Sequence, residues 1–298
     1  MNRTPVSRKS YYRTHLDDYA EKWSEFLVMR REEGILEVRM HTDGGAAKWG
    51  IGIHRALIPA FHDVAMDPDN ECVILTGTGD AFLGATDPED WERFGFTQKY
   101  TFEKGYDLWY VDQVHEPFAL LDLEIPVIAA VNGPLFIHQE LALLNDLVIC
   151  TPDTTLTDGH YTGMGIVPGD GVQTVFRELL GPIRANHFLL TGQTLDATEM
   201  LALGVVGEVV EKDELLDRAW ELARTVFMAR ARSHRRMTRA LLVQPWREKL
   251  VKELPFGMAM ECWATHGHWA MADERDEFDI GSLKQGLKQG AGSQSDGR

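Results

Sequence analysis

The stretch 125–152, IPVIAAVNGPLFIHQELALLNDLVICTP, decides the fold class of this chain. Two short apolar runs rich in Val and Ile, at 125–133 and 145–152, flank the helix-compatible segment HQELALL. Apolar runs of this length that end at Gly or Pro turns are typical of buried strands. Strand, helix and strand in this order predict a βαβ unit in a mostly parallel sheet with its helices outside.

The same alternation extends outward on both sides. The segments at 35–41 (ILEVRMH) and 71–77 (ECVILTG) are predicted strands, and the segment between them, 53–67, has helical spacing. Downstream, 204–211 is a predicted short strand, preceded by a helix that a capping box from Asp196 to Glu199 opens. The chain is therefore predicted to hold one α/β domain.

The two ends differ from this core. A helix is expected at 16–33, and two long amphipathic helices are expected at 212–242 and 245–273. We expect an N-terminal extension at 1–30, a core at 31–215, a helical region at 216–280 and a disordered Gly/Ser/Gln-rich tail at 281–298.

Composition excludes several classes of protein. The formal net charge of −16 disfavours nucleic acid as a partner, because such binding needs Lys and Arg against phosphates. Cys72, Cys150 and Cys262 have no CxxC spacing and are expected to be free thiols. The chain shows no signal peptide and no apolar run long enough for a membrane span, so we expect a cytoplasmic protein without a membrane partner.

Three glycine turns follow strand-like segments, at 77–87, 132–140 and 165–173. Glycine lets a backbone approach a ligand closely, and two N–H groups from separate turns can form an oxyanion hole. Neither GxGxxG nor GxxxxGK[ST] occurs, and HExxH and Cys/His ligand spacings are absent. We therefore expect no metal and no cofactor.

The motifs ILTGTG, IPVIAAVNGP, GIVPGDG and FLLTGQTLDATEMLALGVVGEVV, in this order, resemble the crotonase (enoyl-CoA hydratase/isomerase) superfamily over about residues 30–270. The resemblance implies an α/β spiral of ββα units with a helical C-terminal trimerisation region. It also implies a homotrimer or a dimer of trimers, that is, a hexamer. The oxyanion hole would consist of the backbone N–H groups of Gly84 and Ile137.

Departures from the CoA-dependent pattern point to a subfamily. Hydratases usually carry two glutamates; Glu140 matches the first, whereas Tyr161, with His160 next to it, stands at the aligned position of the second. The pattern NGP…HxE, DG-H, GIVPGDG is most similar to 6-oxocamphor hydrolase-like β-diketone hydrolases. These are CoA-independent enzymes that cleave a carbon–carbon bond between two carbonyls by a retro-Claisen reaction. The implied substrate is a small apolar cyclic or bicyclic β-diketone.

The resemblance implies a role for each matching position. Asp170 would be the aspartate of a water-activating His–Asp dyad, and a gapless match puts Tyr161 at the dyad histidine, with His160 one residue earlier. His138 would polarise a carbonyl and Glu261 would be a further catalytic group. The implied substrate-binding residues are Trp49, His54, Phe82 and Glu140.

Structural roles remain open for all of these positions. Asp170 and Gln173 also fit a capping box, His138 and Glu140 fit the polar start of a helix, and the aromatic residues fit a core. Two other functions remain open as well. One is an enoyl-CoA hydratase/isomerase or related acyl-CoA lyase, for which the basic run 230–239 could bind a CoA phosphate; the other is a non-catalytic scaffold.

Overall fold

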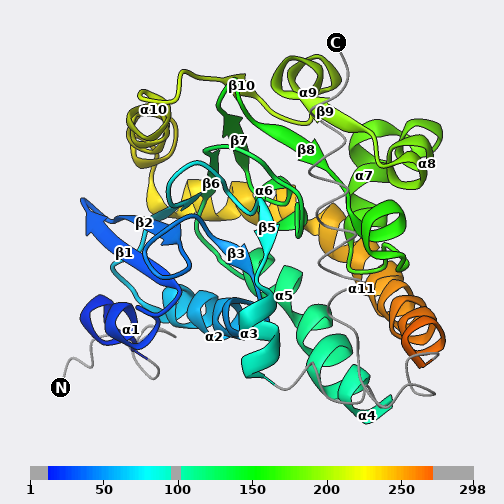
Figure 1. Ribbon diagram of the computed structural model, residues 1–298. Helices are drawn as coiled ribbons and strands as arrows, with labels where there is room; N and C mark the ends of the chain where they lie inside the picture. Colours follow the sequence, from blue (N-terminus) through cyan, green and yellow to red (C-terminus); the bar gives the residue numbers. More distant parts are fainter. Residues whose placement is uncertain (1–12, 95–101, 271–298) are drawn as a thin grey trace.

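The computed structural model describes residues 13–94 and 102–270 (Figure 1). Its main sheet has the strand order β1-β2-β4-β6-β7-β10. β1 and β2 form an antiparallel hairpin, whereas every later pair in this sheet is parallel. The strands are β1 (Leu27–Glu32), β2 (Ile35–Met40), β4 (Cys72–Gly77), β6 (Val127–Val131), β7 (Leu147–Cys150) and β10 (Glu208–Val209). The predicted parallel α/β core is confirmed.

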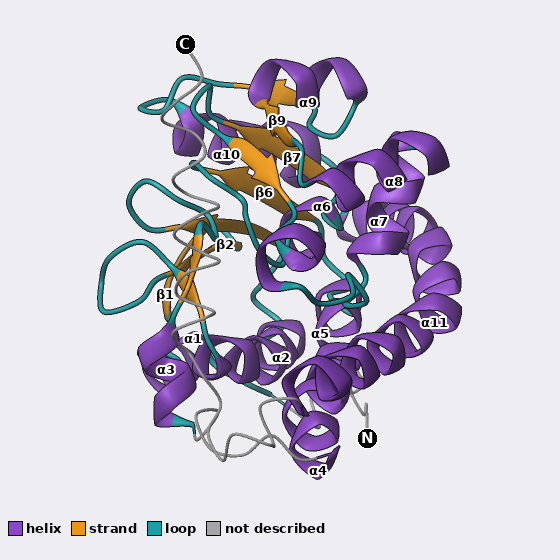
Figure 2. Cartoon of the chain, turned by 45° about the vertical axis from the view of Figure 1, so that its right-hand side comes forward, coloured by secondary structure: helices purple, strands orange, loops and turns teal. Residues whose placement is uncertain are grey.

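Two small sheets and a set of helices complete the described fold (Figures 1 and 2). The small sheets pair β3 (Lys48–Trp49) with β5 (Ala85–Thr86), and β8 (Thr155–Thr157) with β9 (Thr194–Asp196). The α-helices are α1 (Leu16–Lys22), α2 (Ile51–Met66), α3 (Pro88–Arg93), α4 (Phe102–Gly105), α5 (Val111–Leu121), α6 (Glu140–Leu143), α7 (Val172–Leu180), α8 (Pro182–Thr191), α9 (Ala197–Leu203), α10 (Leu215–Leu222) and α11 (Arg232–Ala270). Three π-helical segments are η2 (Tyr106–Tyr110), η3 (His160–Met164) and η4 (Ala223–Met228).

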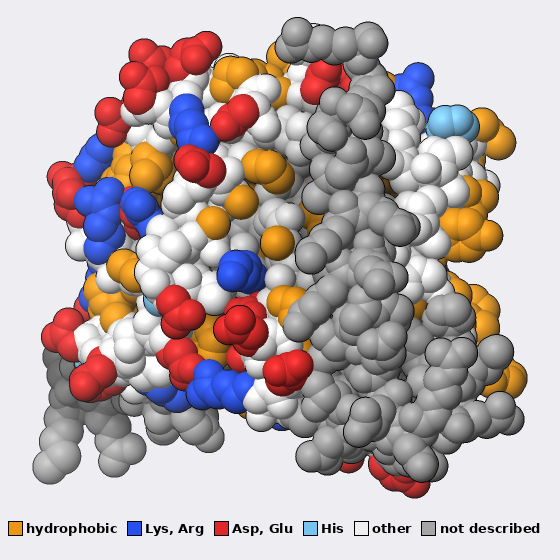
Figure 3. All heavy atoms as spheres, in the orientation of Figure 1, with side chains coloured by type: hydrophobic (Ala, Val, Ile, Leu, Met, Phe, Trp, Pro, Cys, Tyr) orange, Lys and Arg blue, Asp and Glu red, His pale blue; other side chains and the backbone are white. Residues whose placement is uncertain are grey.

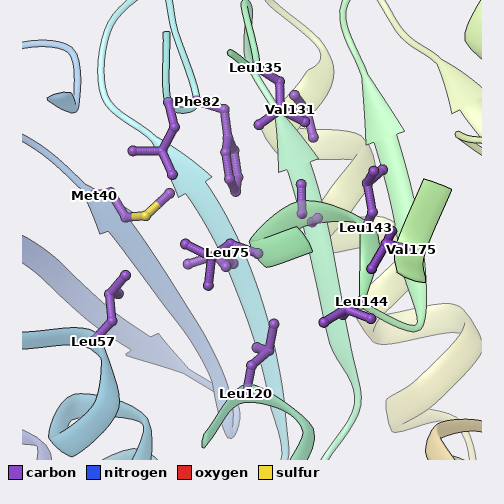
Figure 4. Close-up of a cluster of buried hydrophobic side chains, with 14 of the residues drawn as sticks. Met40, Leu57, Leu75, Phe82, Leu120, Val131, Leu135, Leu143, Leu144 and Val175 are labelled. Atoms are coloured by element: carbon purple, nitrogen blue, oxygen red, sulfur yellow. The ribbon is translucent and has the colours of Figure 1, made fainter. Parts of the chain in front are cut away.

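The central strands β4 and β6 are buried on both faces, as their apolar sequences require. One face packs against α10 and η4 through a cluster that includes Ile74, Ile128 and Trp220. The other face packs into a larger core beneath α2, α5 and α6. Figure 4 shows side chains of this core, among them Leu75 and Phe82, pointing between the strands and helices.

The expected helix at 16–33 is wrong in its second half. α1 ends at Lys22, and the following residues form β1, whose Leu27 is buried while Val28 is exposed. The apolar residues of LVMRRE fit both the helical period of 3.6 residues and the strand period of two residues. The antiparallel hydrogen bonds to β2 stabilise the strand, so this segment becomes β1.

The expected break between the two C-terminal helices is also displaced. The chain leaves the helix after η4 and re-enters it at Arg232, and α11 then runs through Pro245 and Pro255. A proline deprives the carbonyl four residues earlier of its donor. Here these carbonyls belong to Leu241 and Val251, two residues on the exposed side of α11, where water can replace the missing donor.

Smaller predictions are confirmed. Asp196 and Glu199 form the capping box of α9, and all three cysteines are free thiols. Among the described helices, none has the length and apolar character that crossing a bilayer requires.

On the face shown in Figure 3, acidic and basic side chains are interspersed over the region of β1 and α1–α3. The elements of this region are joined by ion pairs such as Lys22–Asp63 and Arg93–Glu25. The predicted tail at 281–298 lies outside the described residues.

Candidate active site

A cluster of ionisable side chains is buried where the glycine turns meet. The turn after β6 depends on Gly133, whose φ is 153° and whose hypothetical Cβ would lie 2.0 Å from the backbone oxygen of Asp80. Only glycine allows this contact between the first two turns. The turn contains His138, a non-glycine residue at φ 50°, two residues before α6 begins. A left-handed conformation at a histidine is uncommon and is a feature often found at functional sites.

His160 lies at the start of η3, and both of its ring nitrogens face carboxylates. Nδ1 is hydrogen-bonded to Asp158 Oδ2 at 2.9 Å, and Nε2 lies 3.2 Å from Asp170 Oδ2. The backbone N–H of His160 also donates to Asp158 Oδ1 at 3.1 Å. All three side chains are buried, so the ring is held from both sides.

Asp170 lies in the turn that precedes α7. Its Oδ1 accepts a hydrogen bond from the N–H of Val172 at 3.3 Å, so the carboxylate satisfies one free donor of the helix. The expected capping box with Gln173 is wrong, because Gly171, at φ 111°, occupies the N-cap and Gln173 accepts from the Gly171 N–H. The left-handed glycine brings the chain into α7 while Asp170 Oδ2 faces the histidines.

Glu261 comes from α11, far away in sequence, and accepts a hydrogen bond from the Gly169 N–H at 2.9 Å. The loop and the helix approach unusually closely there. A Cβ on Gly169 would lie 2.2 Å from the Gly257 oxygen, and a Cβ on Gly257 would lie 2.4 Å from the Gly169 oxygen. This pair of glycines is what allows α11 to place a carboxyl group beside Asp170.

His138 forms the second half of the cluster. Its Nδ1 is hydrogen-bonded to Glu140 Oε1 at 2.7 Å and lies 3.7 Å from Asp170 Oδ2. The ring is stacked on Trp49, with centroids 3.8 Å apart, and the His54 ring lies 5.1 Å from that of Trp49 and 5.9 Å from that of His138. Packing and hydrogen bonding therefore fix the orientation of the imidazole.

Three members of the cluster were not predicted as site residues. Glu116 on α5 is fully buried, and its Oε2 lies 3.7 Å from His138 Nδ1 and 3.8 Å from His54 Nε2. Gln113, one turn earlier, donates to the backbone oxygen of Asp170 at 3.2 Å. Nothing in the sequence of this amphipathic helix marks either position, whereas Asp158 is part of the motif DG-H and could have been found from it.

Burial and charge separate the protonation states of these groups. Burial favours a neutral His160, but the Asp170 and Asp158 carboxylates outweigh it and raise the pKa of His160 well above its usual value. Burial likewise opposes ionisation of Asp170, yet the charge of His160 lowers the pKa of Asp170 to about 2. At neutral pH this pair is therefore an ion pair.

Burial shifts the two other histidines and the three glutamates of the cluster toward their neutral forms. Burial lowers the pKa of His138 and, more strongly, that of His54. Burial raises the pKa of Glu261 to about 8 and raises the pKa values of Glu116 and Glu140 well above the usual range. Strongly separated pKa values among neighbouring groups are typical of acid–base sites.

The structure does not bring every candidate residue into this cluster. The side chain of Tyr161 is 54% exposed, and Phe82 lies in the hydrophobic core. The N–H groups of Gly84 and Ile137 find no hydrogen-bond acceptor among residues 13–94 and 102–270. Such N–H groups could serve a ligand, as an oxyanion hole requires.

Two groups of three side chains have donor atoms close enough to hold a metal ion. They are Glu116, His138 and Glu140, and His160, Asp170 and Glu261, with all donor atoms of a group within 4.8 Å of one another. In each group a histidine nitrogen already faces a carboxylate at 2.7 or 3.2 Å. The expectation of a metal-free site stays a prediction.

Comparisons of the sequence with a family model and with known proteins indicate the same family. Residues 30–266 match the family model described as enoyl-CoA hydratase/isomerase. Carnitinyl-CoA dehydratase of Salmonella paratyphi B is 32% identical over 216 residues, covering 67% of this chain and 74% of the relative.

Solved structures agree with this assignment. A β-diketone hydrolase from the cyanobacterium Anabaena sp. PCC 7120, bound to (S)-3-oxocyclohexyl acetic acid, has a TM-score of 0.79 and 35% identity, covering 84% of this chain and 98% of that one. An enoyl-CoA hydratase/isomerase from Mycobacterium paratuberculosis has a TM-score of 0.73 at 18% identity, covering 89% and 98%, and shows similarity of fold alone.

Proposed function

Because this chain belongs to the enoyl-CoA hydratase/isomerase family, the crotonase superfamily, we propose that it is a CoA-independent hydrolase of small, apolar cyclic or bicyclic β-diketones. The reaction is a retro-Claisen cleavage, in which water adds to one carbonyl and the bond to the carbon between the carbonyls breaks. The observation that carries the proposal is the buried Asp170 carboxylate between His138 and His160. A His–carboxylate pair suits the activation of water.

The other half of the reaction requires stabilisation of negative charge. The tetrahedral oxyanion would be bound by the N–H groups of Gly84 and Ile137, and the enolate would be protonated inside the cluster. Trp49 and His54 would form the wall of the substrate site, since both pack beside His138. Tyr161 and Phe82 have no role in this proposal because neither lies in the cluster.

The sequence of the cluster supports a substrate other than an acyl-CoA. Glu140 keeps the position of one hydratase glutamate, but it is buried and hydrogen-bonded to His138. Tyr161 stands at the aligned position of the second, and the neighbouring His160 is the residue that is paired with two aspartates. A β-diketone activates its own central carbon, so neither a thioester nor a metal is needed.

The test is loss of 1,3-diketone absorbance for a panel of cyclic and bicyclic diketones, with and without EDTA. Turnover by the wild type that survives EDTA and falls roughly 10²–10⁴-fold in Asp170→Asn is the expected result. A matched control is Asp17→Asn, which changes an exposed aspartate of α1. Absence of turnover across the whole panel would refute the proposal.

A second candidate function is hydration or dehydration of an acyl-CoA, favoured by the 32% identity to carnitinyl-CoA dehydratase. Isothermal titration calorimetry with CoA and crotonyl-CoA distinguishes the two candidates. Binding at micromolar concentration would favour the second candidate, whereas the diketone hydrolase is expected to show none.

A further inference from the structure

The two histidines beside Asp170 differ in which of their nitrogens are free. Both ring nitrogens of His160 face carboxylates, at 2.9 Å from Asp158 and 3.2 Å from Asp170. Two facing carboxylates favour the doubly protonated ring, which has no lone pair to offer as a base and whose N–H groups face carboxylates. With Asp158 and Asp170 on either side, it is a buried imidazolium that keeps the Asp170 carboxylate ionised.

His138 is placed differently. Its Nδ1 is hydrogen-bonded to Glu140 at 2.7 Å, while its Nε2 has no hydrogen-bond partner among the described residues. The ring plane is fixed by stacking on Trp49, and the preceding residue is Ile137, whose N–H is available for an oxyanion. A carboxyl group behind one nitrogen and an open second nitrogen is the arrangement of a general base.

We propose that His138, oriented by Glu140, is the base that deprotonates water, and that Asp158 and His160 are positioning residues that act through Asp170. This inference rests on the proposed function and reverses the roles that the sequence resemblance implies for the two histidines. Asp158, which the resemblance leaves without a role, becomes necessary because it closes the second side of His160.

The step balances without any further reactant. Nε2 of His138 takes a proton from water as the oxygen forms a bond to one carbonyl carbon, and the carbonyl electron pair moves onto its oxygen. When this pair returns, the bond to the central carbon breaks, and its electrons form the enolate of the second carbonyl. The proton held by His138 then passes to the enolate carbon, which restores the neutral base.

The charges around His138 are compatible with this role. Glu116 on α5, Glu140 on α6, His54 on α2, His160 on η3 and Asp170 from the third turn surround it. Burial outweighs the nearby carboxylates and lowers the pKa of His138, so its imidazole is neutral and ready to accept a proton at neutral pH.

The first experiment reads the protonation states directly and needs no substrate. ¹⁵N NMR of the full chain with labelled histidine, assigned with His138→Gln and His160→Gln, should show an imidazolium at His160 and a neutral ring at His138 at neutral pH. His187→Gln, on the exposed face of α8, is the control that should remove one unrelated signal. A neutral His160 together with a charged His138 would overturn the proposal.

The second experiment uses turnover and applies once a diketone substrate is found. Asp158 is in direct contact with His160 but is the smallest of the charges that raise the pKa of His138, so Asp158→Asn should move the acid limb of the kcat/KM profile far more if His160 is the base. We expect this limb to move little while kcat falls, and His138→Gln to lose roughly 10²–10⁴-fold. A limb that moves to lower pH by about one unit or more in Asp158→Asn would overturn the assignment. Absence of any turnover would refute the function, while the NMR result would still decide the assignment of the two histidines.

Discussion

At the scale of single residues, the Asp170 carboxylate contacts the start of a helix and two histidines at the same time. Its carboxylate accepts from the first turn of α7, faces His160 at 3.2 Å and lies 3.7 Å from His138. Asp170 is not the N-cap residue, which is Gly171, but its hydrogen bond to Val172 at the start of α7 is compatible with a catalytic role. This hydrogen bond helps to fix the carboxylate, and its charge acts on the two histidines.

The lowered pKa of Asp170 predicts a dependence of stability on pH. Asp170 has a pKa near 3.8 in the unfolded chain and about 2 in the folded protein, because the charge of His160 outweighs burial. Its stabilising contribution is complete above pH 4 and is lost as the pH falls through about 2. Urea unfolding from pH 5 to pH 2.5 should show the difference in free energy of unfolding between wild type and Asp170→Asn shrinking by about 1–2 kcal/mol. A constant difference would contradict this ion pair.

Tyr161 gives the opposite prediction. Its side chain is 54% exposed while the neighbouring His160 is buried against Asp170. Tyr161→Phe should leave kcat and KM for a diketone unchanged, whereas His160→Gln should lower kcat. A loss of kcat in Tyr161→Phe would place its hydroxyl in the reaction.

The sequence predicts that His160 or Tyr161 lies in the site but does not decide which of the two. A gapless match that counts back from GIVPGDG places Tyr161 at the position of the dyad histidine. The segment η3 is π-helical, with hydrogen bonds between residues five apart, so its turn holds one residue more than an α-helical turn. A gapless match does not allow for this extra residue, and in the structure His160 is the residue that faces Asp170. Glu116 is harder still, because its position on α5 becomes part of the site only when α5 packs against α6 and the third turn.

At the scale of elements, strands that are buried on both faces are the easiest to predict. β4, β6 and β7 appear as apolar runs closed by turns, because both of their faces need apolar side chains. β1 is missed because one of its faces is exposed and its short pattern fits a helix equally well. The contact between α11 and the third turn could not be predicted either, since it joins residues about ninety positions apart.

That contact supports a prediction at Gly257. Replacing a glycine inside a helix by alanine usually stabilises it by about 1 kcal/mol. In Gly257→Ala the added methyl would lie 2.3 Å from Gln173 Nε2 and 2.4 Å from the Gly169 oxygen, so the loop that carries Asp170 must move. Thermal or urea unfolding should show a loss of about 1–3 kcal/mol, together with reduced kcat. Gly163→Ala, whose methyl would meet no atom within 4 Å, is the control and should be tolerated. Equal stability of the two variants would contradict this close contact.

At the scale of the whole molecule, α11 does more than deliver Glu261. It packs on α5, η2 and α7 through buried residues such as Leu250 and Leu254, yet it also exposes large apolar side chains to solvent. The exposed fractions are 70% for Leu241, 59% for Leu242, 67% for Phe256 and 70% for Trp263. Apolar side chains gathered on one helix in this way are typical of a surface that another protein chain covers.

We propose that other copies of this chain cover α11, since members of this family are typically oligomeric. Light scattering coupled to size exclusion should give three or six times the chain mass of 33.6 kDa. Replacing Leu241 and Leu242 together by Glu should shift the protein toward the monomer, because charged side chains at such an interface lose their hydration on assembly. Val28→Glu changes another exposed apolar residue, on β1 and with an exposed fraction of 54%, and should leave the mass unchanged. A wild type that is monomeric at micromolar concentration would refute the assembly, and the exposed side of α11 would then need a different partner.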